Sequence, residues 1–434
     1  MIILLLFALM FLLMALGLPI ALAIGLPAIG LIVTPGVFPA TVAFSALGQT
    51  VVQQLFSGVD SFDLLAVPLF MIAGALMETG GISRRLIDFC DSLVGWAPGG
   101  LAAAAIVASM IIAGISGSAA ADTAAIGAVV IPAMIRQGYP PAFAAAVVAA
   151  GGSIGIIIPP SIPMVIFGFM TNISTSQLFA GGMLVGVLMG LSFIVVAVWI
   201  SWRKGYGTRH AFAWSRVAAT GRDAFWSLGA PVVVLGGILS GVFTVTEAAA
   251  LAVFYALLVG VVINGELRWG QLPALVVRSQ IIAAGILFII AMAKVFGWLL
   301  AMQQAASLLD GFVNALALPP TGLLLLVMGL LLVVGCVMET TAALLLLVPV
   351  LATLTPQMQV DPVQFGVLVV VNLAIGMLTP PVGICLFVSC GIANVSLGRV
   401  SGAVIPLVVA AMVDLFVAAL WPPLTLWLPT LFYR

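Results

Sequence analysis

Charged side chains are scarce in this sequence. Lys, Arg, Asp and Glu make up 6% of the 434 residues, whereas 64% are hydrophobic. A soluble domain carries about a quarter charged residues, so this composition excludes one. Apolar runs of roughly 20 residues, enough to cross a bilayer as helix, recur along the chain. These runs lack the alternation of barrel strands, so the composition predicts an all-α polytopic membrane protein in a lipid bilayer.

Cysteine and histidine are also rare. The four cysteines form no ligand-type pair, so neither a zinc site nor a disulfide framework is predicted. The single histidine, His210, lies in the most polar stretch of the chain, which excludes an intramembrane Ser/His dyad and a histidine proton relay. The formal net charge of zero gives no reason to expect nucleic acid as a partner. No Gly-x-x-x-x-Gly-Lys phosphate loop is present, and no cofactor is predicted.

The N-terminal apolar run, residues 1–33, lacks the basic start and the cleavage site of a signal peptide. We expect it to be retained as one span or as a tight pair of spans that break at Gly17 and Pro19. Farther along, Gln49–Ser61 is polar for its surroundings and is interpreted as an interfacial arm.

Basic residues predict the topology, because Lys and Arg collect in cytoplasmic loops. The stretch Arg203–Arg222 holds five of the thirteen Lys and Arg residues and is predicted to be cytoplasmic. The apolar region Gly99–Ile135 is preceded by Arg84 and Arg85 and followed by Arg136. It is therefore predicted to enter and leave on the cytoplasmic side, as a re-entrant helical hairpin.

A second long apolar region, Thr321–Leu354, lies inside Val295–Gly398, a stretch without Lys or Arg. We expect it to form a second hairpin that enters from the periplasmic side. A span that starts near Ser279 contains Lys294, the only basic side chain near mid-span. Snorkelling of Lys294 to an interface is the preferred interpretation, and contact with a substrate is the alternative.

The two hairpin regions are related in sequence. Ala121–Pro132 aligns with Met338–Pro349 at an offset of 217 residues (339 − 122 = 217), which pairs an Asp with a Glu. Downstream, Gly152–Ser161 aligns with Leu373–Val382 at an offset of 221 (376 − 155 = 221). Two copies of hairpin plus broken helix that enter from opposite faces form an inverted-topology repeat. Such repeats build many secondary transporters, with the binding site at the midplane where broken helices meet.

Both copies carry a Pro-Pro pair, Pro159-Pro160 and Pro380-Pro381, which interrupts a transmembrane helix. Adjacent prolines remove two donors and push the preceding residue out of the α region, so nearby carbonyls lose their helical partners. Beside a bound cation, these carbonyls become oxygen ligands. We therefore expect a sodium ion at each break. At the second break, Thr379 adds a hydroxyl that its repeat mate Ile158 at the first break lacks.

Each hairpin tip begins its second helix near an acidic residue, Asp122 in the first and Glu339 in the second. The helix macrodipole favours such a residue, which is the structural interpretation. The functional interpretation is that each carboxylate steadies a cation or its ligands, and we favour an indirect role over direct ligation. The tip and break motifs contain no Lys or Arg, so an anionic substrate is expected to bind helix N-terminal N–H groups, hydroxyls and bound sodium. The residues predicted to support the site or contact substrate are Asp122, Thr123, Glu339, Ser161 and Asn372.

Several motifs together resemble a known family. GISGSAAADTAAIG, QGYPPAFAAAVVAAGGSIGIIIPPSIPMVIFG and DPVQFGVLVVVNLAIGMLTPPVGICLFV are similar to the large membrane subunit of TRAP (tripartite ATP-independent periplasmic) transporters. LGLPIALAIG and VPLFMIAGALMETGGIS also match, so the resemblance covers nearly the whole chain.

The resemblance implies a bacterial inner-membrane, multi-pass permease that is not an enzyme. It would work with a small four-helix membrane subunit, expected as a separate polypeptide, and a periplasmic substrate-binding protein. It implies sodium-coupled import of a small organic anion, such as a C4-dicarboxylate or a sugar acid, by an elevator mechanism. Sodium, as coupling ion, is the only metal ion expected. The sodium-site residues carried over by motif are Ser116, Ser118, Gly152, Ser153 and Pro159 for one site, and Gly335, Thr340, Thr341, Gly376 and Thr379 for the other.

The predicted organisation alternates scaffold and transport segments. Its parts are scaffold spans and arm (1–98), the first transport repeat (99–182), scaffold spans with the basic loop (183–320), the second transport repeat (321–402) and a C-terminal span (403–434). A stand-alone sodium/dicarboxylate symporter of related architecture is the alternative function. An intramembrane aspartyl protease is a remote alternative, because Asp122 follows three alanines and lacks the Gly-x-Gly-Asp signature.

Overall fold

The computed structural model describes residues 2–34, 44–207 and 212–433, and every regular element within them is a helix. His210 lies outside the described residues. Eight helices in the described part are long and apolar enough to cross a membrane, or nine if the bent pair Asp63–Thr79 and Ile82–Val94 counts as one span. The prediction of an all-α, polytopic membrane protein is thus confirmed.

The N-terminal run forms two helices that break where the sequence predicted. Gly17 adopts φ +82°, which favours glycine, and Pro19 precedes the second helix. The predicted interfacial arm is the end of a helix that packs on α2 and α13. The helices of this region are α1 (Ile2–Ala15), α2 (Ile20–Val33), α3 (Phe44–Ser57) and α4 (Ala66–Thr79).

The first repeat contains the predicted hairpin and broken helix. After α5 (Ile82–Val94), the hairpin is α6 (Gly100–Ser116) and α7 (Ala119–Arg136). The broken helix is α8 (Pro141–Ser153) and α9 (Ile162–Thr171). The helical backbone is interrupted at the Pro-Pro pair, as proline chemistry predicts.

Five long helices and two short helices connect and flank the repeats. They are α10 (Thr175–Lys204), α11 (Trp214–Leu239), α12 (Val245–Leu257) with its π-helical continuation (Leu258–Ile263), α13 (Leu272–Met302), α14 (Ala305–Leu316), α20 (Leu397–Leu420) and, at the end, α21 (Pro423–Phe432). The basic stretch Arg203–Arg222 is not all loop, because Arg216 and Arg222 lie on α11. Arg278 likewise lies within α13, which begins before the predicted start near Ser279.

The second repeat has the same plan. Its hairpin is α15 (Pro320–Val337) and α16 (Thr340–Leu351), and α17 (Thr355–Met358) follows. Its broken helix is α18 (Pro362–Gly376) and α19 (Ile384–Ala393). Helix α19 packs on α7 and α8 of the first repeat, and α9 packs on α16 of the second. The two repeats therefore exchange their second half-helices.

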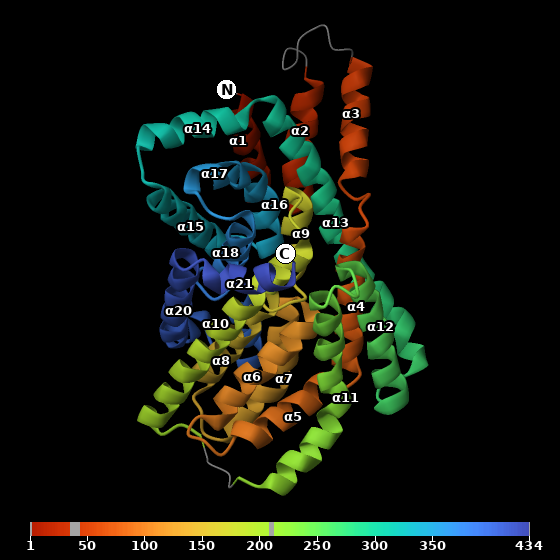
Figure 1. Ribbon diagram of the computed structural model, residues 1–434, viewed down its shortest axis with the longest axis vertical. Coiled ribbons are helices and arrows are strands. Elements are labelled where there is room, and N and C mark those ends of the chain that lie inside the picture. The colour runs from red at the N-terminus through yellow and green to blue at the C-terminus, as the bar shows by residue number, and fades with distance from the viewer. Residues whose placement is uncertain (1, 35–43, 208–211, 434) are drawn as a thin grey trace.

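The two hairpins lie in opposite halves of the molecule. In Figure 1, α6 and α7 occupy the lower half and α15 and α16 the upper half, as an inverted repeat requires. The base of the first hairpin is at the basic end, since Gly99 lies against Ser201 near the end of α10. At the upper end, Gln357 Nε2 donates a hydrogen bond to Asp310 Oδ1 at 2.5 Å and joins α17 to α14.

The structural register between the hairpins differs from the sequence alignment. Helices α6 and α15 end at Ser116 and Val337, which gives an offset of 221 (337 − 116 = 221). This is the offset of the helix breaks, so one register relates both parts, and the offset of 217 is wrong by one helical turn. The N-cap residue Ser118 of α7 therefore corresponds to the N-cap residue Glu339 of α16, and Asp122 has no acidic counterpart.

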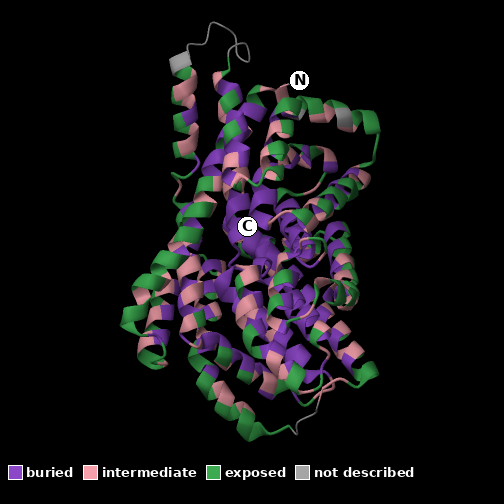
Figure 2. Ribbon diagram, turned by 180° about the vertical axis from the view of Figure 1, so that it is seen from behind, coloured by how far each residue is buried: buried purple, intermediate pink, exposed green. Residues whose placement is uncertain are grey.

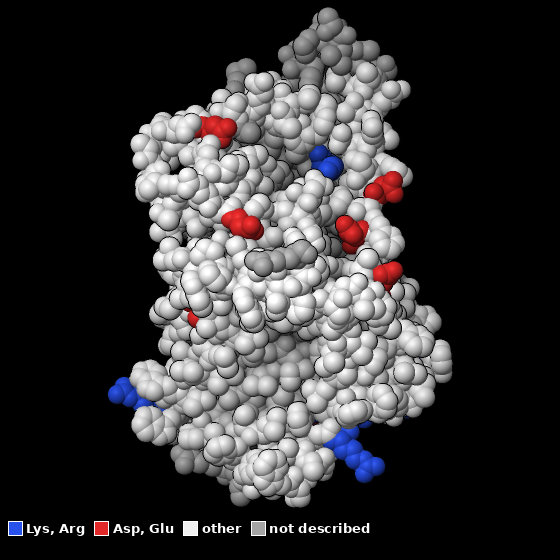
Figure 3. All heavy atoms as spheres, in the orientation of Figure 1, with Lys and Arg blue, Asp and Glu red and all other residues white. Residues whose placement is uncertain are grey.

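The core lies where the broken helices cross. Every residue of α8 from Phe143 and every residue of α18 from Val363 is buried, and Figure 2 shows buried residues concentrated in the middle of the molecule. Basic side chains visible in Figure 3 gather at the lower end, with one exception farther up, and the visible acidic side chains lie higher. The core thus holds the breaks at mid-height between two ends of different charge.

Candidate cation sites at the hairpin tips

The first hairpin turns at Gly117, whose φ of +66° suits glycine. The turn brings Ser116 beside Asp122, and the Ser116 hydroxyl donates a hydrogen bond to Asp122 Oδ1. The Ser118 N–H donates to Ser116 Oγ at 3.3 Å. Ser116 and Asp122 are buried, so this tip encloses a carboxylate among hydroxyl and amide groups.

Two glycines of the first break let the hairpin tip approach closely. A Cβ atom on Gly152 would lie 2.0 Å from Thr123 Oγ1, and one on Gly155 would lie 2.2 Å from Asp122 Oδ2. Because no side chain fits there, the hairpin's polar groups lie directly against the break. The structure thus places the predicted residue Gly152 against Thr123 of the hairpin.

The hydroxyls around the first break donate to backbone carbonyls. Thr123 Oγ1 donates to Ala119 O at 2.7 Å, and Ser153 Oγ donates to Ala150 O at 2.8 Å. Ser161 caps α9, accepting from the Met164 N–H at 3.3 Å. Thr123 and Ser153 donate their hydroxyl protons to carbonyls, so their oxygens keep lone pairs that can face a cation. The Ser161 oxygen accepts one hydrogen bond as a cap and still has a second lone pair.

At the second tip, Glu339 is the N-cap residue of α16. Its carboxylate accepts from the Ala342 N–H at 3.1 Å and from Thr341 Oγ1 at 2.9 Å. These contacts fix the start of α16, which agrees with an indirect role for Glu339. Thr340 is buried, and its hydroxyl oxygen has no hydrogen-bond partner among the described residues.

The second tip is tied to the second break through its backbone. The Val382 N–H donates to Cys336 O at 3.0 Å, and a Cβ on Gly376 would lie 2.5 Å from the carbonyl carbon of Gly335. Thr379 Oγ1 donates to Ile375 O at 2.8 Å, which leaves its lone pairs available. Gly335, Gly376 and Thr379 therefore lie close together, and their role as a sodium site stays a prediction.

Buried oxygens without partners mark both tips. Among the described residues, seven buried side-chain atoms lack a hydrogen-bond partner, and three of them belong to predicted site residues: Asp122 Oδ2, Thr340 Oγ1 and Asn372 Oδ1. Asn372 donates its Nδ2 to Met328 O at 2.9 Å, which leaves Oδ1 alone. Buried polar atoms are nearly always paired, so an unpaired oxygen indicates a missing water or ion. Carboxylate, amide and hydroxyl oxygens suit a hard cation.

A cavity of about 690 Å³ borders the first tip. Ser116, Ser118 and Asp122 line one wall, and Glu78 of α4 and Arg278 of α13 line the opposite wall. Arg278 was not predicted as a site residue, because the span was expected to start after it, near Ser279. Cys385, at the start of α19, was not predicted either; its helix belongs to the second repeat and packs on α7 at the first site.

Helical hairpins seated on paired helix breaks define a class of membrane protein, the secondary transporters built from inverted repeats. A likeness in fold agrees: the crystal structure of the Alcanivorax borkumensis YdaH transporter matches with a TM-score of 0.69 and 15% identity, covering 93% of this chain and 98% of that one. The family described as "Tripartite ATP-independent periplasmic transporter, DctM component" matches residues 7–424. The chain belongs to this family, so the resemblance predicted from the motifs is confirmed.

Relatives named as permeases share much of the sequence. The chain is 38% identical over 376 residues to the C4-dicarboxylate TRAP transporter large permease protein DctM of Pseudomonas aeruginosa, with 87% of this chain and 88% of that protein covered. It is 38% identical over 380 residues to the sialic acid TRAP transporter large permease protein SiaM of Vibrio cholerae, with coverage of 88% and 89%.

A third relative is longer than this chain. The isethionate TRAP transporter permease protein DctMQ of Oleidesulfovibrio alaskensis is 39% identical over 407 residues, which cover 94% of this chain and 63% of that protein. These relatives are permeases, so the prediction that the chain is a transporter and not an enzyme is confirmed.

Proposed function

We propose that this permease subunit imports a small organic anion together with sodium ions. The observation that carries the proposal is that each hairpin tip rests on a helix break and includes a buried oxygen without a partner. Asp122 Oδ2 supplies that oxygen at the first tip and Thr340 Oγ1 at the second, and Asn372 Oδ1 of α18 is a further unpaired oxygen in the second repeat. A sodium ion at each tip would satisfy these oxygens together with the carbonyls freed by the prolines.

The proposed substrate class rests on the cavity beside the first tip. Arg278 offers a guanidinium to a carboxylate or sulfonate, and Ser116 and Ser118 offer polar groups on the facing wall. Relatives are named for isethionate, a C4-dicarboxylate and sialic acid, which are all organic anions. Sodium at Asp122 would offset the carboxylate's repulsion of such an anion, and anion binding would then depend on sodium.

We further propose an elevator mechanism in the bacterial inner membrane. The two hairpins and broken helices would slide as one transport unit along a scaffold that includes α4 and α13. Cross-packing of α9 on α16 and of α19 on α7 supports one rigid unit. By family membership, the partners would be a small four-helix membrane subunit and a periplasmic substrate-binding protein that delivers the anion.

The test is uptake into proteoliposomes that contain this chain and the small subunit, with loaded binding protein outside. We expect uptake to follow an inward sodium gradient without ATP. A matched arm replaces sodium by potassium on both sides, and uptake that persists there contradicts sodium coupling. A second arm omits the binding protein, and full uptake in that arm would favour the stand-alone symporter.

A further inference from the structure

A second cavity, of about 330 Å³, lies away from both hairpin tips. Four helices form it: α3 with Gln54, α9 with Phe169, α13 with Lys294, and α16 with Leu345. It borders the second hairpin, since Gly297 of α13 lies against Pro349 of α16. The cavity thus separates a helix of the proposed scaffold from helices of the proposed transport unit.

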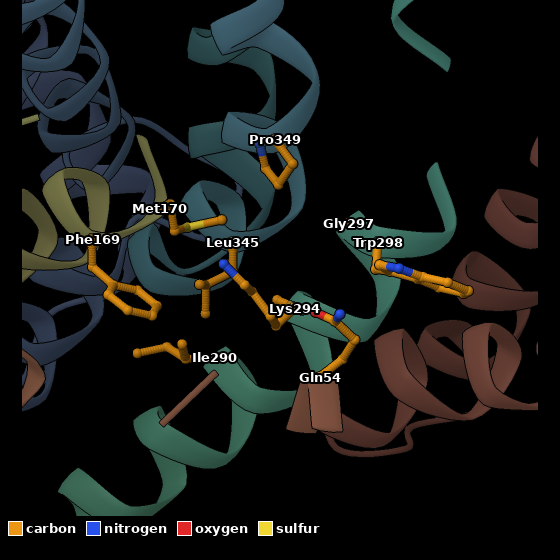
Figure 4. A pocket seen from close by; sticks show the side chains of 10 residues that line it. Gln54, Phe169, Met170, Ile290, Lys294, Gly297, Trp298, Leu345 and Pro349 are labelled. Atoms are coloured by element: carbon orange, nitrogen blue, oxygen red, sulfur yellow. The ribbon is translucent and has the colours of Figure 1, made fainter. Parts of the chain in front are cut away.

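Lys294 lines this cavity, and its positively charged side chain is exposed. Figure 4 shows its side chain crossing toward Phe169 and Leu345, with Gln54 on the other side of its stem. The ammonium lies 5.5 Å from the centroid of the Phe169 ring. Both interpretations of Lys294 stay predictions, because the exposed side chain agrees with snorkelling to an interface and its place in the cavity wall allows contact with a substrate.

No acidic residue in the described part of the chain forms an ion pair with Lys294. The ion pairs of the described residues are Arg85 with Glu266 and Arg216 with Asp91, and no hydrogen bond to the Lys294 ammonium is present in that part of the chain. An ammonium has three donors, so capacity for an anion remains. The remaining wall is mostly apolar, and a concave apolar site with a few polar groups is typical of small-molecule binding.

Helix α13 carries two cationic residues, and each of them lines a cavity beside one of the hairpins. Arg278 lines the cavity beside the first hairpin, and Lys294 lines the cavity beside the second. They are separated by 16 residues (294 − 278 = 16), or about 24 Å along the helix. A transport unit that slid along α13 would therefore pass from one cation to the other.

We propose that the Lys294 cavity is a second anion-binding site, which holds the carboxylate or sulfonate of a small organic anion on the scaffold. The ammonium and the Gln54 amide bind the anionic head, and Leu345 and Pro349 contact the apolar part. This inference rests on the proposed function, because it takes Arg278 as the anion-binding residue beside the first hairpin. It adds Lys294 as a second anion-binding residue beside the second hairpin.

The experiment uses the purified full chain in phosphatidylcholine nanodiscs, with succinate and isethionate as probe anions. Trp298 lies in the cavity wall and reports binding there through its fluorescence, and Trp298→Phe identifies its share of the signal. We expect a saturable change with at least one probe. Lys294→Met should weaken binding roughly tenfold or more, because a charged hydrogen-bond partner is lost. Lys294→Arg, which keeps the charge, should retain most of it.

A matched control is Lys204→Met. Lys204 also stacks on an aromatic ring, with its ammonium 6.0 Å from the Tyr206 centroid, but it lies at the end of α10 outside the cavity. We expect the Trp298 titration to be unchanged in this variant. No Trp298 response to either probe, or equal responses in Lys294→Met and the wild type, would overturn the proposal.

Two further arms identify the source of the anion and separate the two proposals. If phosphatidylglycerol in the nanodisc abolishes the probe response and alone produces the Trp298 change, the site binds lipid headgroups and the proposal is overturned.

The titration should persist without sodium, because the cavity lacks the hairpin-tip oxygens. Sodium-independent uptake with a normal Trp298 titration would overturn only the proposed coupling. A titration that requires sodium would place the probe at the tips and overturn this inference.

Discussion

The two helix breaks share a backbone plan and differ in their exposure to the surroundings. All residues from Gly151 to Ser161 are buried, whereas Pro380 and Pro381 are exposed and Thr379 is only partly buried. The half-helix after the first break is capped by the Ser161 side chain, and the half-helix after the second begins at Gly383 without a side-chain cap. The first break is therefore closed, and the second can be reached from outside.

The acidic residues at the two tips also differ in how far they are enclosed. Asp122 is 1% exposed and keeps one oxygen without a partner, whereas both oxygens of Glu339 accept hydrogen bonds within its own turn. One tip thus encloses a carboxyl group, and the other offers the neutral oxygen of Thr340. Two repeats with the same backbone plan can therefore form chemically different sites, because the side chains at each tip determine the chemistry of that site.

The strongest way to test this contrast is to remove the enclosed charge. Asp122→Asn keeps the shape and the acceptor for Ser116 but removes the charge that faces a cation. We expect a loss of about 3 kcal/mol in sodium binding, roughly a hundredfold in the half-saturating sodium concentration of uptake. Glu339→Gln is the matched change at the other tip and should cost about 1 kcal/mol or less, since it weakens only a cap. Equal effects of the two variants would refute the contrast.

The second test adds a methyl group at the other break. Gly376→Ala places a Cβ 2.5 Å from the carbonyl carbon of Gly335, and backbone cannot yield as a flexible side chain can. Overpacking of this kind costs about 2 kcal/mol, so we expect a lower unfolding temperature and reduced uptake. Gly329→Ala on α15 is the control, because nothing lies within 4 Å of its added Cβ. A stable, active Gly376→Ala variant would mean that hairpin and break are not in close contact.

Local chemistry explains which features were predictable from the sequence. Proline has one φ range and no donor, so the breaks at Pro159 and Pro380 follow from the sequence alone, as does the N-terminal break at Gly17. The hairpins were predictable because arginines flank the first apolar region and are absent around the second. These features depend on residues close together in the chain.

Features that depend on packing or on similar residues were not predictable. The hairpin helices are rich in Ala and Leu, so a shift of one turn keeps the same faces apolar, and the alignment paired Asp122 with Glu339 in place of Ser118. Arg278 and Lys294 face cavities between distant helices, and no local pattern indicates that. The charge rule also started this span after Arg278, near Ser279, although a long basic side chain is accommodated within a helix.

A smaller effect is expected from the hydroxyl that distinguishes the breaks. Thr379→Ala removes an oxygen whose proton already goes to Ile375 O, so its lone pairs are what the cation would lose. We expect about 1.4 kcal/mol, or roughly a tenfold rise in half-saturating sodium. Ile158→Val, at the equivalent position of the first break, should lower stability by about 1 kcal/mol and leave the sodium dependence unchanged. Unchanged sodium dependence in Thr379→Ala would exclude this hydroxyl as a ligand.

The smallest effect, and the most diagnostic, concerns two neighbouring threonines at the second tip. Thr340 Oγ1 is buried without a partner, whereas Thr341 Oγ1 donates to Glu339. Valine has the shape of threonine without the hydroxyl. In sodium-free buffer, Thr340→Val should raise stability by up to about 1 kcal/mol, because an unpaired buried hydroxyl is costly. Thr341→Val should lower stability by about 1 kcal/mol, because a paired one is lost.

Sodium should reverse the order of the two variants. A ligand that binds only the folded state stabilises it in proportion to the logarithm of its concentration over Kd. Thr340→Val loses a cation ligand, so we expect its sodium-induced rise in unfolding temperature to shrink, with Kd weakened about fivefold. Thr341→Val keeps the unpaired Thr340 oxygen, so we expect it to retain more of the rise than Thr340→Val does. Thermal unfolding in sodium chloride and in choline chloride at equal ionic strength measures both. If Thr340→Val retains the wild-type rise, the unpaired oxygen has another role and the second site lies elsewhere.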